Sequence, residues 1–370
     1  MNALIEMIKS KIKIREIKNS DINEVLSRHN THFGDGRKRT PDQWIWEYNG
    51  SYPDLFVFTV IEDNNQIVGT QGMIPIYIYV NGKRYLSGKS EDSLLNSKYR
   101  GGTLFQELYE YAMSLCNAKN MQCIWGYTPA VKVWKNKLQF SVYEKVMYES
   151  ILILNLQNTL SEIFKSKRGM VKKIAMVPLI IFWYLYSLCI SSFRFPKKSP
   201  RMKFSIEYKL RSINDLDVLY EHLRAKYPEL IHIDQDEKYI VWRILKNSNN
   251  KYKTYFLYED NILKAYCYAG IGNKKIASLT DFTFENAEAG TFLLRNLLND
   301  LRNEKISKVS FLGNAKNPLM INTFNLLKRF GFLKIRSSMS FVLKNIAYKD
   351  EAILYDIKNW YVGGLWTERL

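Results

Sequence analysis

One short loop combines a cation with two adjacent glycines, and it reads YRGGTLF from Tyr99 to Phe105. The stretch before it, Ser90 to Leu95, has strand character, and the stretch after it, Leu104 to Cys116, repeats apolar residues at helical spacing. At such a turn the first amides of the helix have no partner and point outward at the positive end of the helix dipole. Glycines let an anion approach these amides, so the pattern predicts a phosphate-binding loop.

The elements that must position this loop follow an alternating α/β plan. Two strands, Leu55 to Glu62 and Gln66 to Met73, are predicted on either side of a polar turn. Asn81-Gly82 is a strong hairpin signal that leads toward the strand before the loop. After the helix, Gln122 to Tyr127 has the composition of a buried strand. We therefore expect a mixed sheet with the loop at a strand end.

The second half of the chain repeats this plan. Trp242 precedes two predicted strands that meet at a polar turn, as Trp46 does in the first half, and the repetition indicates a duplication. The turn that corresponds to the glycine loop reads TFENAEAG from Thr283 to Gly290. It has no arginine, and its carboxylates would repel a phosphate. We expect the second copy to serve as a scaffold or to bind the acceptor.

The order of these elements resembles motifs A and B of the GNAT N-acetyltransferase superfamily. The resemblance covers roughly Lys13 to Ser150 and, more faintly, Phe204 to Leu343, so the chain looks like a tandem-GNAT protein. In the family's loop pattern, two later positions that are usually small are occupied here by Thr103 and Phe105. The resemblance implies an α/β fold of mixed sheets, with two GNAT-like domains in tandem joined by an apolar helical segment. It also implies acetyl-CoA as co-substrate.

The resemblance carries binding and catalytic roles to particular residues. The expected acyl-CoA-binding residues are Leu94, Leu95, Arg100, Gly101, Gly102, Thr103 and Leu104. In the family the base is often a carboxylate on the strand before the loop, which points here to Asp92 first and to Glu91 second. The family's tyrosine acid is absent from the stretch Val133 to Phe140, so Tyr127 is the expected substitute.

Length and patterning predict four regions, because 370 residues exceed one ordinary core. We expect a GNAT-like acyl-CoA-binding domain over residues 1–155 and a degenerate copy over residues 204–346. A basic and apolar linker over residues 156–203 would separate them, and residues 347–370 would form a tail.

The linker contains twenty residues without a charge, Ile174 to Phe193, with lysines and arginines on both sides. This composition predicts a helix at the surface of an anionic membrane. A buried inter-domain helix and a true membrane span are the alternatives, and Pro178 disfavours a straight span.

Charge and cysteine usage favour a cytoplasmic protein with an anionic partner. The net charge is +18, and Met1 to Ser20 has no apolar core of signal-peptide length. The four cysteines and four histidines are scattered, so neither disulfides nor a metal site is expected. The protein could attach peripherally to the inner face of the cytoplasmic membrane.

Together these features predict an N-acyltransferase that takes the acyl group from acetyl-CoA. Its acceptor would be an amine of a surface-polysaccharide or lipid-linked precursor at the cytoplasmic membrane face. One alternative is an aminoacyl-tRNA-dependent transferase of the peptidoglycan-bridge type, in which the basic surface holds nucleic acid. The other is a catalytically silent membrane-associated adaptor. Binding of acyl-CoA separates the first hypothesis from the last.

Overall fold

The computed structural model describes residues 12–34, 38–165, 169–194, 204–247, 250–272 and 275–366. It divides into two compact units, each assembled from three stretches of chain. Unit 1 comprises Met1–Glu144, Lys238–Ser248 and Met339–Tyr355. Unit 2 comprises Lys145–Glu237, Asn249–Ser338 and Asp356–Leu370. The amino-terminal stretch that bears on export, residues 1–11, lies outside the described residues.

Unit 1 is built on a mixed sheet with the strand order β1-β2-β3-β4-β5-β15-β6. Its strands are β1 Ile12–Glu16, β2 Val57–Asp63, β3 Gln66–Val80, β4 Lys83–Leu95, β5 Cys123–Thr128, β15 Ser340–Asn345 and β6 Ser141–Tyr143. Among the pairs in this order only β4 and β5 are parallel, because α4 connects them as a crossover helix. The glycine loop lies in this crossover, between β4 and α4.

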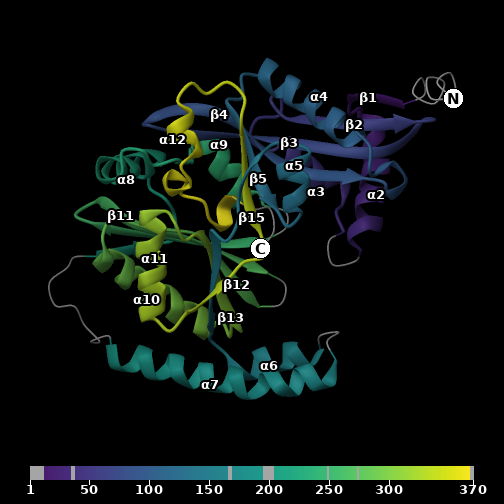
Figure 1. Ribbon diagram of the computed structural model, residues 1–370. Helices are drawn as coiled ribbons and strands as arrows, with labels where there is room; N and C mark the ends of the chain where they lie inside the picture. The colour runs from purple at the N-terminus through teal and green to yellow at the C-terminus, as the bar shows by residue number, and fades with distance from the viewer. Residues whose placement is uncertain are drawn as a thin grey trace. The chain divides into compact units, whose positions relative to one another are not determined.

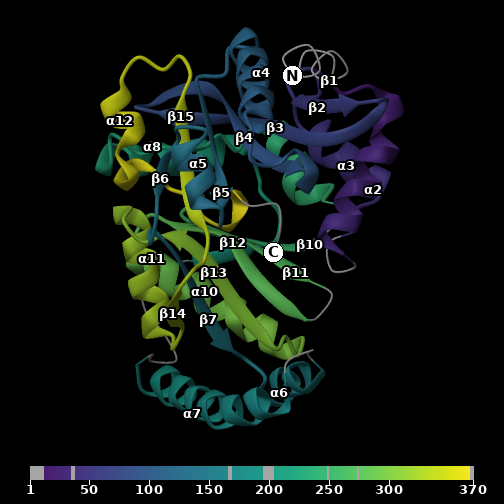
Figure 2. The same cartoon turned by 45° about the vertical axis from the view of Figure 1, so that its right-hand side comes forward.

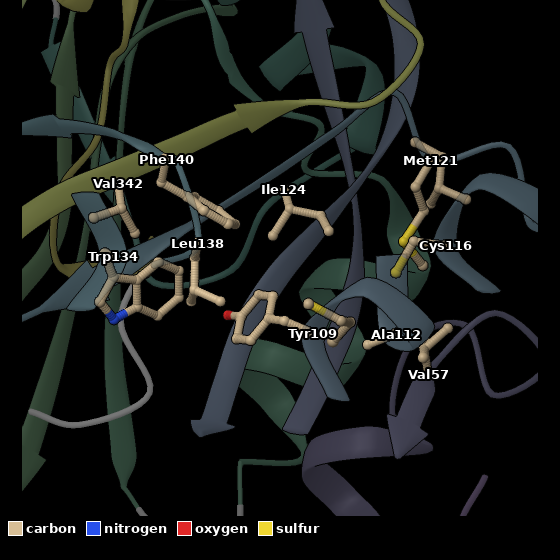
Figure 3. Close-up of a cluster of buried hydrophobic side chains, with 12 residues drawn as sticks. Val57, Tyr109, Ala112, Cys116, Met121, Ile124, Trp134, Leu138, Phe140 and Val342 are labelled. Atoms are coloured by element: carbon tan, nitrogen blue, oxygen red, sulfur yellow. The ribbon is translucent and has the colours of Figure 1, made fainter. Parts of the chain in front are cut away.

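Most helices of unit 1 contact this sheet. The helices of the unit are α2 Ile22–Phe33, α3 Pro41–Tyr48, α4 Leu104–Ala118, α5 Val131–Asn136, α9 Glu237–Ile240 and α12 Glu351–Tyr355. Helix α3 begins with a capping box between Thr40 and Gln43, with Pro41 at its first position. Between α4, α5 and the sheet, the rings of Tyr109, Trp134 and Phe140 lie 4.8–5.7 Å apart in a closed aromatic cluster (Figure 3).

Unit 2 repeats the plan, with the strand order β8-β10-β11-β12-β13-β7-β14. Its strands are β8 Phe204–Glu207, β10 Lys251–Glu259, β11 Ile262–Gly272, β12 Ile276–Phe284, β13 Lys308–Asn314, β7 Met147–Ile153 and β14 Leu333–Arg336. Its helices are α6 Leu156–Lys165, α7 Met170–Arg194, α8 Ile213–Lys226, α10 Ala287–Asn303 and α11 Pro318–Arg329. Two repeated α/β units, as the sequence predicts, are thus confirmed (Figure 1).

The two units exchange one strand each. β7 follows the strands of unit 1 along the chain but lies between β13 and β14 in unit 2. β15 follows the strands of unit 2 but lies between β5 and β6 in unit 1. The stretches of chain that form the two units therefore alternate along the sequence, whereas the sequence predicts the contiguous ranges 1–155 and 204–346. The difference has a simple cause, because alternating side chains identify a strand but not the sheet that it joins.

Helix α7 lies beside α6 on unit 2 and divides into a packed and an open face (Figure 2). On the packed face, Trp183 Nε1 donates to Gly331 O at 3.2 Å, and Ser187 is buried. On the open face, Leu179 and Phe182 keep about 70 % of their surfaces exposed, at 69 and 71 %. Within the described residues, none of the helices combines the length and the hydropathy that a membrane crossing requires.

The basic residues on both sides of this helix are described only in part. Lys165 ends α6 and is exposed. The expected flanking cations Lys167, Arg168, Lys197 and Lys198 lie outside the described residues. Lys173, another flanking cation, is described, and its Nζ donates to Phe164 O at 2.7 Å.

Candidate active site

The central feature of unit 1 is an opening between its two parallel strands. The ladder of β4 and β5 contains only the pairs Gly88–Ile124 and Lys89–Trp125. Beyond these pairs, residues 90–95 of β4 and residues 127–130 at the end of β5 line a cavity of about 580 Å³. Its walls are largely apolar, and Arg100, Gly101 and Gly102 of the glycine loop belong to its lining. A cavity of this kind suits an extended ligand with an anionic end.

The glycine loop leaves the start of α4 accessible. Gly101 has φ +103°, and a Cβ placed on Gly101 or Gly102 would meet no atom within 4 Å. Thr103 precedes the helix and makes no side-chain cap, so the first amides of α4 remain available. Arg100 is exposed, lines the cavity and donates through Nε to Leu95 O at 3.0 Å. An anion such as a pyrophosphate fits this arrangement.

Most of the expected acyl-CoA-binding residues line this one cavity. Leu94, Leu95, Arg100, Gly101 and Gly102 belong to its walls. Two others have different surroundings. Thr103 Oγ1 donates to Glu107 Oε1 at 2.6 Å, and Leu104 packs against the cluster of Ile61, Val68 and Leu108. Thr103 and Leu104 do not line this cavity.

A β-bulge in β4 shapes the wall beside the opening. Thr70 pairs with Leu94 and Gly72 with Glu91, so β4 has one residue more than β3 over this interval. Gln71 fills the bulge from β3. Its Nε2 donates to Ser90 Oγ at 3.0 Å, and its Oε1 accepts from Ser93 Oγ at 2.5 Å. Gln71 is fully buried, so these bonds hold the bulge in one geometry.

Asp92 lies in the bulge with φ +50° and is held by partners from α2, α3 and the loop between them. Its Oδ2 accepts from Arg39 Nη1 at 2.5 Å and from Tyr48 Oη at 2.9 Å. His29 Nδ1 lies 3.3 Å from Oδ1. Burial by itself would raise the pKa of Asp92, but the Arg39 charge and the contacts with His29 and Tyr48 hold that pKa well below its ordinary value. Such a carboxylate is a weak base.

Glu91 and Tyr127 face the same cavity from opposite strands. Glu91 is half-buried and pairs with the ammonium of Lys89. The Tyr127 hydroxyl is buried and has no hydrogen-bond partner among the described residues. Burial raises the pKa of Tyr127 well above its usual value, and the Glu91 charge adds to this effect. An unpartnered hydroxyl in a cavity wall is suited to bond a ligand.

Sequence reasoning missed three groups of this site, Arg39, Tyr48 and Gln71. Arg39 and Tyr48 are separated from Asp92 by more than forty residues, and nothing in their local sequence points to a carboxylate partner. Gln71 stands inside a predicted strand like any other polar residue. His32 lines this cavity and a second one of about 440 Å³ beside α2. Among the described residues, no cluster of His, Cys, Asp or Glu could hold a metal ion.

The corresponding turn of unit 2 is equipped differently. Helix α10 is capped by Asn286, whose Oδ1 accepts from Glu288 N at 3.1 Å and Ala289 N at 3.0 Å. Glu285 pairs with Lys264 at 2.7 Å, and it lines a cavity of about 280 Å³ at this turn. Two of the first amides of α10, which correspond to the uncapped amides of α4, are therefore bonded to a side chain here, next to a carboxylate.

Comparisons with known proteins agree with this geometry. The family model described as acetyltransferase (GNAT) domain matches residues 13–145, which contain the bulge, the loop and both walls of the cavity. No curated protein matches the chain in sequence.

Solved structures share the fold over nearly the whole chain. A probable N-acyltransferase from Enterococcus faecalis V583 has a TM-score of 0.60 at 7 % identity, over 91 % of this chain and 73 % of that one. Saccharomyces cerevisiae N-myristoyltransferase with bound myristoyl-CoA has a TM-score of 0.56 at 13 % identity, over 92 % and 84 %. A tandem GNAT protein from the clavulanic acid pathway has 0.55 at 11 %, over 92 % and all of that chain. At such identities the likeness establishes the fold.

Proposed function

We propose that the protein is an N-acyltransferase that uses acetyl-CoA, because residues 13–145 match the family model of the acetyltransferase (GNAT) domain. The observation that carries the proposal is the open glycine loop at the end of the cavity between β4 and β5. Arg100 would pair with a phosphate of the co-substrate, and the amides of Gly101 to Leu104 would bond its oxygens. The apolar walls at Leu94 and Leu95 would hold the arm that carries the thioester.

In this proposal one residue accepts a proton and another donates one during acyl transfer. The acceptor nitrogen attacks the thioester carbonyl, the C–S bond breaks, and the nitrogen loses a proton. Glu91 receives that proton, because its half-buried carboxylate faces the cavity. Tyr127 donates its hydroxyl proton to the departing sulfur, and its raised pKa keeps it protonated beforehand. Asp92 keeps a fixed charge beside them and anchors the bulge through Arg39.

The acceptor in this proposal is an amine of a lipid-linked or surface-polysaccharide precursor at the cytoplasmic face of the membrane. Support comes from the open face of α7, where large apolar side chains stand exposed on one helix. The net charge of +18 also favours binding to an anionic membrane surface. The enzyme would then meet its acceptor at the lipid boundary.

One titration tests the function. Purified protein is titrated calorimetrically with acetyl-CoA, and separately with tRNA at two salt concentrations. We expect saturable acetyl-CoA binding and release of free CoA thiol when an amine acceptor is supplied. Salt-sensitive tRNA binding without acetyl-CoA binding would instead support aminoacyl transfer. Absence of both would leave the adaptor hypothesis.

A further inference from the structure

Unit 2 has the same opening between parallel strands as unit 1. β12 and β13 take the places of β4 and β5 in the strand order. Their parallel ladder ends at the pair Leu279–Phe311. β12 also carries a bulge at this point, since Tyr268 pairs with Asp281 but Ala269 pairs with Leu279. The backbone features that create the cavity of unit 1 are therefore repeated.

The chain itself fills this second opening with residues 359–366, which we call the closing segment. It includes the last residue of the short helix η5 (Ile357–Asn359) and all of η6 (Gly364–Trp366). A Cβ on Gly363 would lie 3.1 Å from Leu312 O of β13 and 3.8 Å from Thr280 O of β12. One residue thus contacts both strands just beyond the end of their ladder.

The closing segment is hydrogen-bonded as an extra strand. Gly363 forms an antiparallel bridge with Gly313 of β13, and Asn314 N donates to Val362 O at 3.0 Å. On the other side of the segment, Tyr361 N donates to Ile231 O at 2.8 Å. The side chain of Asn314 adds a bond to Trp360 O at 2.9 Å. Backbone groups at the edge of the opening are satisfied by the chain and not by a ligand.

The fit leaves no room for a second occupant. A Cβ on Gly364 would lie 2.9 Å from Thr280 Cα, closer than side chains pack, so only glycine lets the segment pass the bulge of β12. Trp360, Val362 and Trp366 are at most 3 % exposed. The segment is therefore part of the core of unit 2.

We propose that the closing segment takes in unit 2 the place that acyl-CoA takes in unit 1, so that each chain binds one acyl-CoA. The inference rests on the proposed function for its account of unit 1. The Asn286 cap agrees with it, because the amides of Glu288 and Ala289 at the start of α10 are also bonded within the chain. Unit 2 then keeps the fold of unit 1, but its opening is occupied by the closing segment and is not free to bind acyl-CoA.

The first experiment measures stoichiometry and exchange on the full chain. Calorimetry with acetyl-CoA should give one site per chain. Hydrogen exchange should find the amides of Asn314 and Tyr361 strongly protected with and without acetyl-CoA, while the loop at Gly101 and Gly102 gains protection only when acetyl-CoA is present. Two sites per chain, or loss of protection at Tyr361 on adding acetyl-CoA, would overturn the proposal.

A matched pair of glycine variants tests the fit. Gly364→Ala places a methyl group against Thr280, so its Tm should fall by roughly 2–10 °C. The control is Gly272→Ala in β11, where the nearest atom, Ile276 O, lies at an ordinary 3.7 Å, and it should change Tm little. Equal Tm values for both variants would contradict a tightly held segment.

The two proposals fail separately. If the parent protein binds no acetyl-CoA, the proposed function fails, and exchange at Tyr361 and Asn314 alone decides the closing segment. Rapid exchange there would show that the opening of unit 2 is not filled in solution.

Discussion

Arg39 Nη1 lies 2.5 Å from Asp92 Oδ2, and this buried ion pair fixes the bulge of β4 to the chain that leads into α3. Arg39 bonds Glu47 through its other terminal nitrogen at 3.0 Å. The exposed fractions of the Arg39 and Asp92 side chains are only 9 and 6 %, so water cannot replace either partner. The pair therefore supports the wall of the cavity between β4 and β5, which Asp92 lines.

Replacing Asp92 with asparagine should cost about 3–5 kcal/mol of unfolding free energy, because Arg39 loses one of its two buried carboxylate partners. The folded pKa of Asp92 is depressed, so the parent's advantage in unfolding free energy is complete above the unfolded pKa near 3.8 and is lost progressively as pH falls from that value through the folded pKa. Urea unfolding of both proteins between pH 3 and 7 measures this, with exposed Asp54→Asn as the control. A difference that persists unchanged at the lowest pH would argue against the ion pair.

Replacing Arg100 with alanine should weaken acetyl-CoA binding by on the order of 1.5–3 kcal/mol, as expected for a charge-assisted bond to phosphate. Calorimetry measures the change. Lys98→Ala is the matched control, because Lys98 is an exposed neighbour that does not line the cavity. If both variants weaken binding equally, general charge and not the loop attracts the co-substrate.

Replacing Tyr127 with phenylalanine should lower kcat on the order of 10²-fold and leave acetyl-CoA affinity nearly unchanged, because the hydroxyl acts on the leaving sulfur. Stability should not fall, since the buried hydroxyl has no protein partner to lose. Tyr143→Phe is the control, because Tyr143 donates to Tyr355 O at 2.6 Å and its loss should cost about 1 kcal/mol. An unchanged kcat for the Tyr127 variant would remove this residue from the mechanism.

Replacing Leu179, Phe182 and Leu185 with serine should release the protein from anionic vesicles. These side chains are 69, 71 and 54 % exposed, and inserting all three is worth roughly 5–9 kcal/mol gross. Vesicle sedimentation at low salt measures binding, and Tm should stay close to that of the parent. Trp183→Ser is the contrast on the packed face, where the indole bonds Gly331 O, so it should lower Tm and leave vesicle binding intact. A parent protein that stays in the supernatant would contradict the membrane proposal.

Replacing Asp281 with asparagine should raise stability at neutral pH. Burial raises the pKa of Asp281 to about 6, although Tyr266, Thr283 and Gln235 donate hydrogen bonds to it. Protonated Asp281 contributes fully to the free energy of unfolding below the unfolded pKa of 3.8. That contribution is lost as pH rises through 6, which lowers the free energy of unfolding by roughly 3 kcal/mol. The variant should therefore flatten the decline of unfolding free energy between pH 4 and 7, whereas exposed Asp260→Asn should not. A parallel decline in parent and variant would show that Asp281 ionises normally.

Local features of the site could be read from the sequence because they depend on neighbouring residues. The loop from Arg100 to Gly102 combines a charge, a positive φ and a helix start within a few positions, and the structure places it at the end of the cavity. The family match of residues 13–145 and the likeness to a solved tandem GNAT structure confirm the resemblance and the α/β class. Both depend on the order of helices and strands, which local sequence patterns reveal. The roles given to Glu91, Asp92 and Tyr127 stay predictions until the variants are measured.

By itself, then, the sequence determined the repeated α/β plan, the glycine loop and the apolar character of α7, since composition and periodicity act over a few residues. Only the tertiary structure decided which sheet β7 and β15 join, because a strand's side-chain pattern does not name its partner. It also decided that Arg39 holds Asp92 and that residues 359–366 fill the opening of unit 2. Such contacts join residues far apart in the chain. They stabilise the fold appreciably only when packing has excluded water from both partners, and local sequence does not show where that happens.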